Sequence, residues 1–298
     1  MKREKLILHV NALIATLLWA LGYIMTRIAI RHFSVEAVSF LRYFTAAIAL
    51  IVFALIKRMK LPKVADLPLF FFGGAIGIAV YVYAINAGAK TLNAAAVSFI
   101  ISTSPIVTAF LARIFLKEKM GIIGGISLLC ALCGVGVITI FDGEITLNKG
   151  VIWLGFATLL ISSYNIFQRK LLKRYDPLSA TSYCIIAGAV LLSVFAVESF
   201  PQLVDASLME ISAILVLGIF SGGIAYVCWS YALSKAEKTN EVTNYMFLTP
   251  ILTTFLGQLL INEAPTASIY IGGMMVLGGV LLFNNRDKFK KTKKESDD

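Results

Sequence analysis

The chain has 298 residues, of which 58% are hydrophobic and 15% charged, and its formal net charge is +10. Its mean hydropathy of +0.83 lies outside the range of soluble globular domains. The composition therefore excludes a soluble enzyme or binding domain, and it predicts an all-α protein that crosses a membrane many times.

Apolar runs of about 20 residues, enough to cross roughly 30 Å of hydrocarbon, follow one another with short polar breaks. We predict ten transmembrane helices, at residues 6–26, 36–56, 67–88, 94–116, 121–141, 150–168, 177–198, 208–233, 240–261 and 266–284. The first run is too long for a signal peptide and lacks a small-residue cleavage pattern, so we expect it to remain as a span. Because the loops are short, neighbouring helices should pack as antiparallel hairpins, and functional residues should lie among the helices.

The cysteines and histidines do not form a convincing metal or redox site. Cys130 and Cys133 have the spacing of such a site, but no His, Asp or Lys lies near them in the sequence to lower a thiol pKa. A structural role as small hydrophobic residues is therefore favoured. The two histidines lie far from any carboxylate or thiol cluster, so we expect no metal and no other cofactor.

Basic residues predict the orientation, because Lys and Arg that flank spans stay on the cytoplasmic side. With a cytoplasmic N-terminus, most of the 27 basic residues fall inside, whereas the outside loops hold only Arg27, Arg31, Lys90 and Lys149. We therefore expect a cell-membrane protein with both termini in the cytoplasm. The basic tail, residues 286–298, should attract anionic lipid headgroups. Nucleic-acid binding is not favoured, because no soluble module or aromatic-interleaved basic surface accompanies the tail.

The segment Tyr81–Glu118 recurs without a gap as Tyr226–Glu263, and Pro105 matches Pro250. This is an internal duplication. The copies hold predicted spans 3 and 4 and predicted spans 8 and 9. An odd number of spans separates them, so the second copy runs in the opposite direction across the membrane.

Weaker similarity extends the duplication backwards, placing Ser39 opposite Thr181. We predict two inverted repeats, residues 1–143 and 149–285. Inverted repeats with proline-bearing helices near the membrane midplane are typical of alternating-access transporters.

The order of the motifs resembles a known family. The first copy reads VYVYAINAG, SFIISTSPIVTAFLARIFLKE and GIIGGISLLCALCGVGVI, and the second reads AYVCWSYAL, TNYMFLTPILTTFLGQLLINE and IYIGGMMVLGGVLLF. This paired pattern, over about residues 6–285, resembles the EamA-type branch of the drug/metabolite transporter superfamily. The resemblance implies ten helices in two inverted five-helix repeats, with spans 1, 3, 4, 6, 8 and 9 around a central cavity and spans 5 and 10 at the periphery. Proteins of this family mostly move small metabolites, often amino acids, and usually outward.

Polar and aromatic side chains fall on the same six spans, where they need partners or water. Pro105 and Pro250 each free a backbone carbonyl about one turn earlier, which adds acceptors at mid-depth. Each side chain alone could be an interfacial aromatic or an interhelical hydrogen bond. Together they predict an amphipathic substrate pocket formed by Trp19, Tyr83, Asn86, Ser98 and Ser102 from the first half and by Tyr164, Asn165, Tyr226, Trp229, Asn244 and Phe247 from the second.

Charged residues should contribute little to this pocket. Glu118 and Glu263 lie just before spans 5 and 10, where a carboxylate can satisfy free N-terminal donors of a helix. Arg42 lies inside a span, which favours a functional role by default. However, it is near the helix start, where it can snorkel, and the resemblance places it on a helix that does not line the cavity. We therefore expect an uncharged pocket and no intramembrane carboxylate that couples transport to protons.

These observations predict a carrier that exports a small amphipathic metabolite, such as an amino acid, by alternating access. The alternative within this class is a multidrug or nucleobase/nucleoside exporter. A membrane enzyme would need a nucleophile, an acid–base pair or a metal cluster at membrane depth, and none is visible. A channel would need a continuous polar pore lining.

Overall fold

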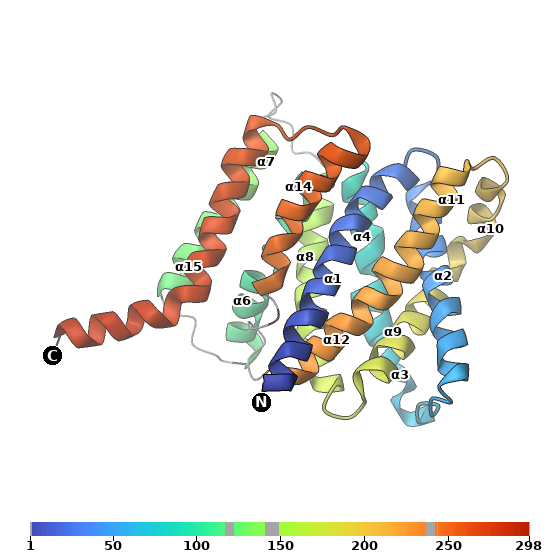
Figure 1. Cartoon of the computed structure of the whole chain (residues 1–298), viewed down its shortest axis with the longest axis horizontal. Coiled ribbons are helices and arrows are strands. Elements are labelled where there is room, and N and C mark those ends of the chain that lie inside the picture. The colour runs from blue at the N-terminus through green and yellow to red at the C-terminus, as the bar shows by residue number, and fades with distance from the viewer. Residues whose placement is uncertain (1, 117–121, 141–148, 237–241, 243, 298) are drawn as a thin grey trace.

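The computed structural model describes residues 2–116, 122–140, 149–236, 242 and 244–297. These residues form helices joined by turns, with no β-strand among them (Figure 1). Within them, seven helices are long and apolar enough to cross a membrane, and three shorter apolar helices cover Ile122–Ile138, Tyr245–Ile261 and Ala267–Phe283. The chain is thus a multi-pass helical membrane protein, as its composition predicted, and the count of ten spans stays a prediction.

The first half contains α1 (Lys2–Ala29), α2 (Val35–Ile56), α3 (Leu67–Gly74), the π-helix η2 (Ala75–Ala79), α4 (Val80–Ala89), α5 (Ala94–Ile101), α6 (Ser104–Leu116) and α7 (Ile122–Ile140). Side chains fix two helix starts: Ser34 accepts from the backbone N–H of Ala37, and Asn93 accepts from that of Ala96. The chain from α3 to α4 is continuous and corresponds to one predicted span.

A break between α5 and α6 interrupts the predicted span at residues 94–116. Pro105 follows this break and removes a backbone donor. Ser102 and Thr103, the two residues at the break, turn their hydroxyls back onto the carbonyls of Phe99 and Ile100, both at 2.7 Å. The proline and these local hydrogen bonds together explain why the helix is discontinuous here.

The second half contains α8 (Lys149–Leu171), α9 (Pro177–Leu192), α10 (Ala196–Ser199), α11 (Leu208–Leu215), the π-helix η5 (Val216–Ile224), α12 (Ala225–Lys235), the 3-10 turn η6 (Asn244–Phe247), α14 (Leu248–Ile261) and α15 (Ala267–Asp297). Asp176 caps α9, and Ser207 with Glu210 forms a capping box at the start of α11. Pro250 follows η6 as Pro105 follows the α5–α6 break.

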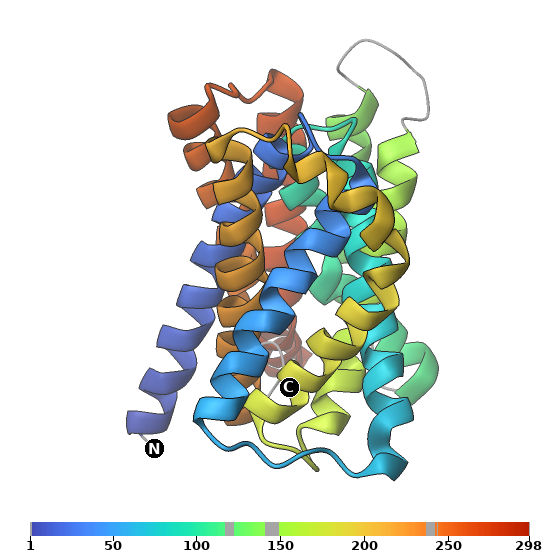
Figure 2. The same cartoon turned by 90° about the vertical axis from the view of Figure 1, so that its right-hand side faces the viewer.

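The helices pack across the two halves of the chain. α1 packs along α12 and α14, α4 packs along α8, and α2 lies between η5 and α9 (Figure 2). α7 and α15 pack against each other at one edge of the molecule (Figure 1). Their backbones approach closely at glycines, because a Cβ on Gly134 would lie 2.6 Å from the carbonyl oxygen of Gly272.

The two helix breaks meet near the middle of the bundle. Oγ of Ser104, beside the α5–α6 break, lies 3.6 Å from Sδ of Met246 in η6. Ser162 on α8 donates to the carbonyl oxygen of Ser104 at 3.0 Å. Irregular backbone in a membrane is stable only where protein or a cavity satisfies it, and a cavity lies beside these breaks.

Candidate functional site

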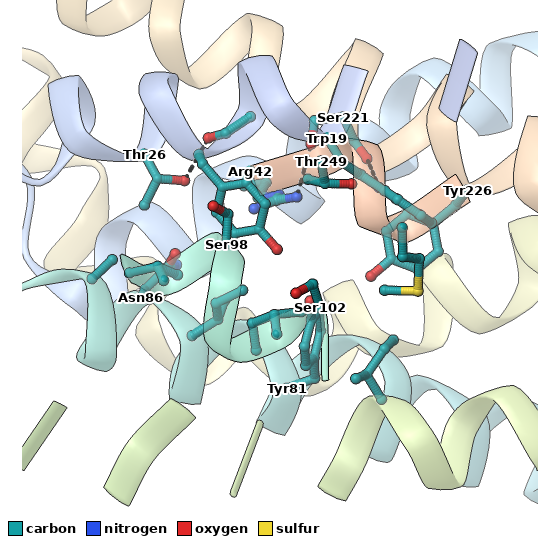
Figure 3. Close-up of a pocket in the computed structure, with 18 residues that line it drawn as sticks. Trp19, Thr26, Arg42, Tyr81, Asn86, Ser98, Ser102, Ser221, Tyr226 and Thr249 are labelled. Carbon is teal, nitrogen blue, oxygen red and sulfur yellow. Dashed lines mark hydrogen bonds between the residues drawn. The ribbon is translucent and has the colours of Figure 1, made fainter. Parts of the chain in front are cut away.

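A cavity lies between helices of both halves (Figure 3). It encloses about 670 Å³ of space between atoms, part of which opens to solvent. Its lining comprises Trp19, Gly22, Tyr23, Thr26, Arg42, Tyr81, Ile85, Asn86, Ala89, Val97, Ser98, Ile101, Ser102, Ile161, Ser221, Tyr226, Met246 and Thr249.

Aromatic side chains from three helices give the cavity an apolar wall. The ring of Trp19 meets that of Tyr226 edge to face, with centroids 5.5 Å apart. Nε1 of Trp19 donates to the carbonyl oxygen of Ser221 at 3.2 Å, which fixes the indole against η5. Tyr81 and Tyr226, which match in the duplication, both line the cavity. Such rings offer apolar contact and faces that attract cations.

Neutral polar side chains also line the cavity. Asn86 donates through Nδ2 to Oγ of Ser39 at 3.0 Å, which leaves its Oδ1 buried without a partner. Oγ1 of Thr249 is also buried and unpartnered. The hydroxyls of Ser98 and Ser102 donate to carbonyls of their own helix, and their oxygens can still accept. Because unpaired buried polar atoms are costly, these atoms are available to a solute or to water.

Arg42 brings a fixed positive charge into the cavity, contrary to the uncharged pocket expected from the sequence. Its side chain is 8% exposed, and its Nη2 donates to Oγ of Ser221 at 3.1 Å. The reason is the packing of α2 against η5, which turns this part of α2 inward. Figure 3 shows Arg42 among the labelled polar side chains.

The structure brings five of the predicted pocket residues together in the cavity lining, namely Trp19, Asn86, Ser98, Ser102 and Tyr226. Seven other polar, aromatic or sulfur-bearing residues line the cavity but were not in the predicted pocket: Tyr23, Thr26, Arg42, Tyr81, Ser221, Met246 and Thr249. Of these, Arg42 was interpreted as structural, and the sequence places Tyr81 among the aromatic side chains of a span expected to line the cavity. A helical wheel would have favoured Tyr81 over Tyr83, because Tyr81 shares one face of its helix with Ile85 and Ala89. For every predicted residue, a role in solute binding stays a prediction.

Two predicted tyrosines are absent from the cavity lining and pack elsewhere. Tyr83 lies on another face of α4 from Tyr81, donates to Oε1 of Glu36 at 3.0 Å and stacks on Phe195. Tyr164 is buried against Gly77, where an added Cβ would lie 2.2 Å from its ring.

Four other predicted residues also lie apart from the cavity lining or cannot be placed. Trp229 packs behind Trp19, with ring centroids 5.0 Å apart. Asn165 is buried with its Nδ2 unpartnered, and Phe247 joins a separate apolar cluster. Asn244 has its side chain outside the described part of the structure.

An ion pair lies beside the end of the cavity lined by Thr26 and Ala89. Arg27 donates through Nε to Oε1 of Glu263 at 3.1 Å and through Nη1 to the carbonyl oxygen of Ala89 at 2.9 Å. Oε2 of Glu263 accepts from the backbone N–H of Ala94 at 3.1 Å. Glu263 therefore satisfies an N-terminal donor of α5, whereas the sequence predicted that it would serve the helix that follows it. Its counterpart Glu118 lies outside the described residues.

Comparisons with known proteins give one family and several transporters. The EamA-like transporter family matches residues 6–140 and again residues 148–285. The uncharacterized transporter YdfC of Bacillus subtilis is 30% identical over 88% of this chain and 86% of its own. A probable terminal-alkyne amino-acid exporter of Streptantibioticus cattleyicolor is 26% identical over 95% of each chain.

A solved crystal structure aligns with a TM-score of 0.63 at 18% identity, covering 95% of this chain and 96% of its own, which supports the fold alone. The family matches cover nearly the whole sequence, and the relatives named above are a transporter and a probable exporter. The chain belongs to the EamA-like transporter family.

Proposed function

We propose that this transporter exports a small amphipathic metabolite, such as an amino acid, by alternating access. The observation that carries the proposal is a cavity lined by matching positions of the two halves, Tyr81 with Tyr226 and Ile101 with Met246. Its aromatic wall and neutral polar atoms suit a solute with both apolar and polar parts. The similarity to a probable amino-acid exporter supports the same solute class.

The packing supports an arrangement of two inverted repeats, residues 1–143 and 149–285, with ten spans. The contact of α1 with α12 has its counterpart in the contact of α8 with α4. Likewise, Asn86 on α4 donates to Ser39 on α2 in the first half, and the equivalent helices of the second half are joined by Thr181 on α9 and Ser230 on α12, at 2.5 Å. Ser230 lies one position before the match of Asn86. Equivalent interfaces of this kind let each half adopt the conformation of the other, so the cavity opens first to one side and then to the other.

We place both termini in the cytoplasm and the protein in the cell membrane, with the tail at residues 286–298 against anionic lipid headgroups. The distribution of basic residues supports this orientation, and both termini lie at the same end of the bundle (Figure 1). In this orientation the Arg27–Glu263 ion pair lies at the external end of the cavity.

Efflux from proteoliposomes tests the proposed function. Vesicles with the purified protein are loaded with a mixture of radiolabelled amino acids, and protein-free vesicles from the same lipids serve as the control. We expect protein-dependent efflux of at least one amino acid that saturates with its concentration. A nucleobase and a lipophilic cationic dye test the alternative. Transport of these two solutes with no amino-acid efflux would contradict the proposal.

A further inference from the structure

Arg42 is the only residue with a fixed charge among the described residues that line the cavity. A guanidinium is a fixed positive charge with five N–H donors and no acceptor. Among the described residues, the lining has no carboxylate to balance this charge, and its other polar side-chain groups are hydroxyls, one amide, the indole N–H of Trp19 and the thioether of Met246. An empty cavity therefore surrounds one positive charge with neutral groups.

The protein leaves much of the binding capacity of Arg42 unused. Nη2 donates to Ser221, and the guanidinium carbon lies 5.4 Å from the ring centroid of Tyr43. Nε is buried without a hydrogen-bond partner. In the described part of the chain, the ion pairs join Arg27 to Glu263, Arg174 to Asp66 and Lys235 to Glu4, and none includes Arg42.

A buried charge without a counter-ion is costly, and an anion at hydrogen-bond distance offsets that cost. The planar fork of a guanidinium matches the two oxygens of a carboxylate. Unpartnered acceptors lie in the same cavity, at Oδ1 of Asn86 and Oγ1 of Thr249. These acceptors and the aromatic faces of Trp19 and Tyr226 can receive an ammonium group.

We propose that Arg42 binds the anionic group of the solute and thereby restricts the carrier to small carboxylates, including zwitterionic amino acids. The proposal rests on the proposed function, because it takes the cavity as the transport site. An organic cation meets a like charge in this cavity, and a neutral nucleobase leaves the charge unbalanced. Both are disfavoured relative to a carboxylate of similar size.

A matched series of competitors tests the charge preference in the wild-type protein. Labelled L-leucine is the first probe in proteoliposomes, followed by any other amino acid that the efflux assay finds. The competitors are the same amino acid, its carboxamide, and the amine that lacks the carboxyl group. Because hydrogen bonds to charged groups are stronger than neutral ones, we expect the carboxamide and the amine to compete about tenfold to a hundredfold more weakly.

Variants then assign this preference to Arg42. Arg42→Gln should lose most of the discrimination, whereas Arg42→Lys should retain part of it, because the charge remains. Arg174→Gln is the matched control, since Arg174 is exposed and remote from the cavity lining. Size-exclusion elution and the thermal unfolding midpoint show whether each variant is folded, and the wild-type competitor series is informative even when Arg42→Gln is not.

The outcomes separate the two proposals. Suppose that the wild-type protein transports an amino acid and discriminates strongly against its carboxamide and its amine. If Arg42→Gln abolishes this discrimination, the proposed function and the role of Arg42 are both supported. Amino-acid transport in which the carboxamide competes as well as the acid, or in which folded Arg42→Gln still discriminates, overturns the role of Arg42 and leaves the proposed function standing. Absence of transport for every amino acid tested overturns the proposed function and the inference that rests on it.

Discussion

Buried polar atoms without hydrogen-bond partners distinguish the cavity from ordinary helix packing. Asn86 is fully buried and binds Ser39 through its amide nitrogen, while its amide oxygen has no partner in the structure. Buried amides in packed interiors normally satisfy both ends. An amide oxygen without a partner, on a residue that lines the cavity, can therefore accept a hydrogen bond from a solute.

Replacing Asn86 tests this role. We expect Asn86→Ala to raise the half-saturation concentration several-fold, because one neutral hydrogen bond contributes about 0.5–1.5 kcal/mol. Ser39 keeps its own hydrogen bond to the carbonyl of Val35, so the fold should survive. Cys133→Ala, at an exposed position of α7, is the control and should leave transport unchanged. Unaltered kinetics in Asn86→Ala, measured in proteoliposomes, would remove this residue from the site.

Gly22 allows α1 to approach η5 beside Arg42. A Cβ at this position would lie 2.3 Å from Oγ of Ser221, the atom that accepts from Arg42. Gly22→Ala should therefore lower the unfolding midpoint, with overpacking that costs about 1–3 kcal/mol. Adding Ser221→Ala removes the crowded oxygen but also the hydrogen bond from Arg42, so it should restore only part of the stability.

Gly125→Ala is the matched control for this substitution. An added Cβ at Gly125 meets no atom within 4 Å, so this variant should not be destabilised. Thermal unfolding in detergent measures all three variants. Equal unfolding midpoints for Gly22→Ala and wild type would show that the contact between α1 and η5 adjusts to an added methyl group at little cost.

The sequence predicted the positions of the helices better than the breaks within them. Hydropathy locates spans because each must satisfy its own backbone in lipid, and proline marked the break before α6. The π-helical segments η2 and η5 carry no proline and were not predicted. Each packs against a segment distant in the sequence, η2 against α9 and η5 against α2, and such contacts cannot be read from local sequence.

The Arg27–Glu263 pair joins three elements at one end of the cavity: the end of α1, the α4–α5 turn and the α14–α15 connection. Glu263→Gln should weaken the contact that holds these three elements together. The pair is partly exposed, with 28% and 21% of the two side chains accessible, so we assign it about 1 kcal/mol. That energy corresponds to about a fivefold shift toward the externally open state.

The rate at which an impermeant maleimide modifies Ser98→Cys in a cysteine-free protein reports the opening. In intact cells, this modification rate should be about fivefold higher when Glu263→Gln is added. Asp66→Asn removes an ion pair elsewhere in the molecule and should leave the rate unchanged. A rate that Glu263→Gln does not alter would show that this pair does not control access.

The proposed membrane orientation rests on the distribution of basic residues and gives a further prediction. In a cysteine-free background, Val204→Cys should react with an impermeant reagent in intact cells, whereas Lys173→Cys should react only after lysis. The reason is that Lys173 belongs to a basic segment predicted to be cytoplasmic, and Val204 to an external one. Both positions are exposed in the structure. Modification of Lys173→Cys in intact cells would invert the proposed orientation.

The sequence predicted the family and the helical architecture, because composition and duplication act over the whole chain. It predicted the site less completely, since a pocket depends on which face each helix turns inward. Tyr83 and Tyr81 differ by only two positions, yet Tyr81 lines the cavity and Tyr83 packs on Phe195. The inward orientation of Arg42 likewise depends on long-range packing between α2 and η5.

Counterflow tests alternating access most directly. Vesicles that hold the protein and a high internal concentration of the unlabelled amino acid are diluted into a trace of the same labelled amino acid. Alternating access predicts transient internal accumulation of label above equilibrium, because a loaded carrier returns with a solute from the opposite side. A channel through the same cavity would only equilibrate the label. Entry of label that neither overshoots nor responds to internal solute would contradict the alternating-access mechanism.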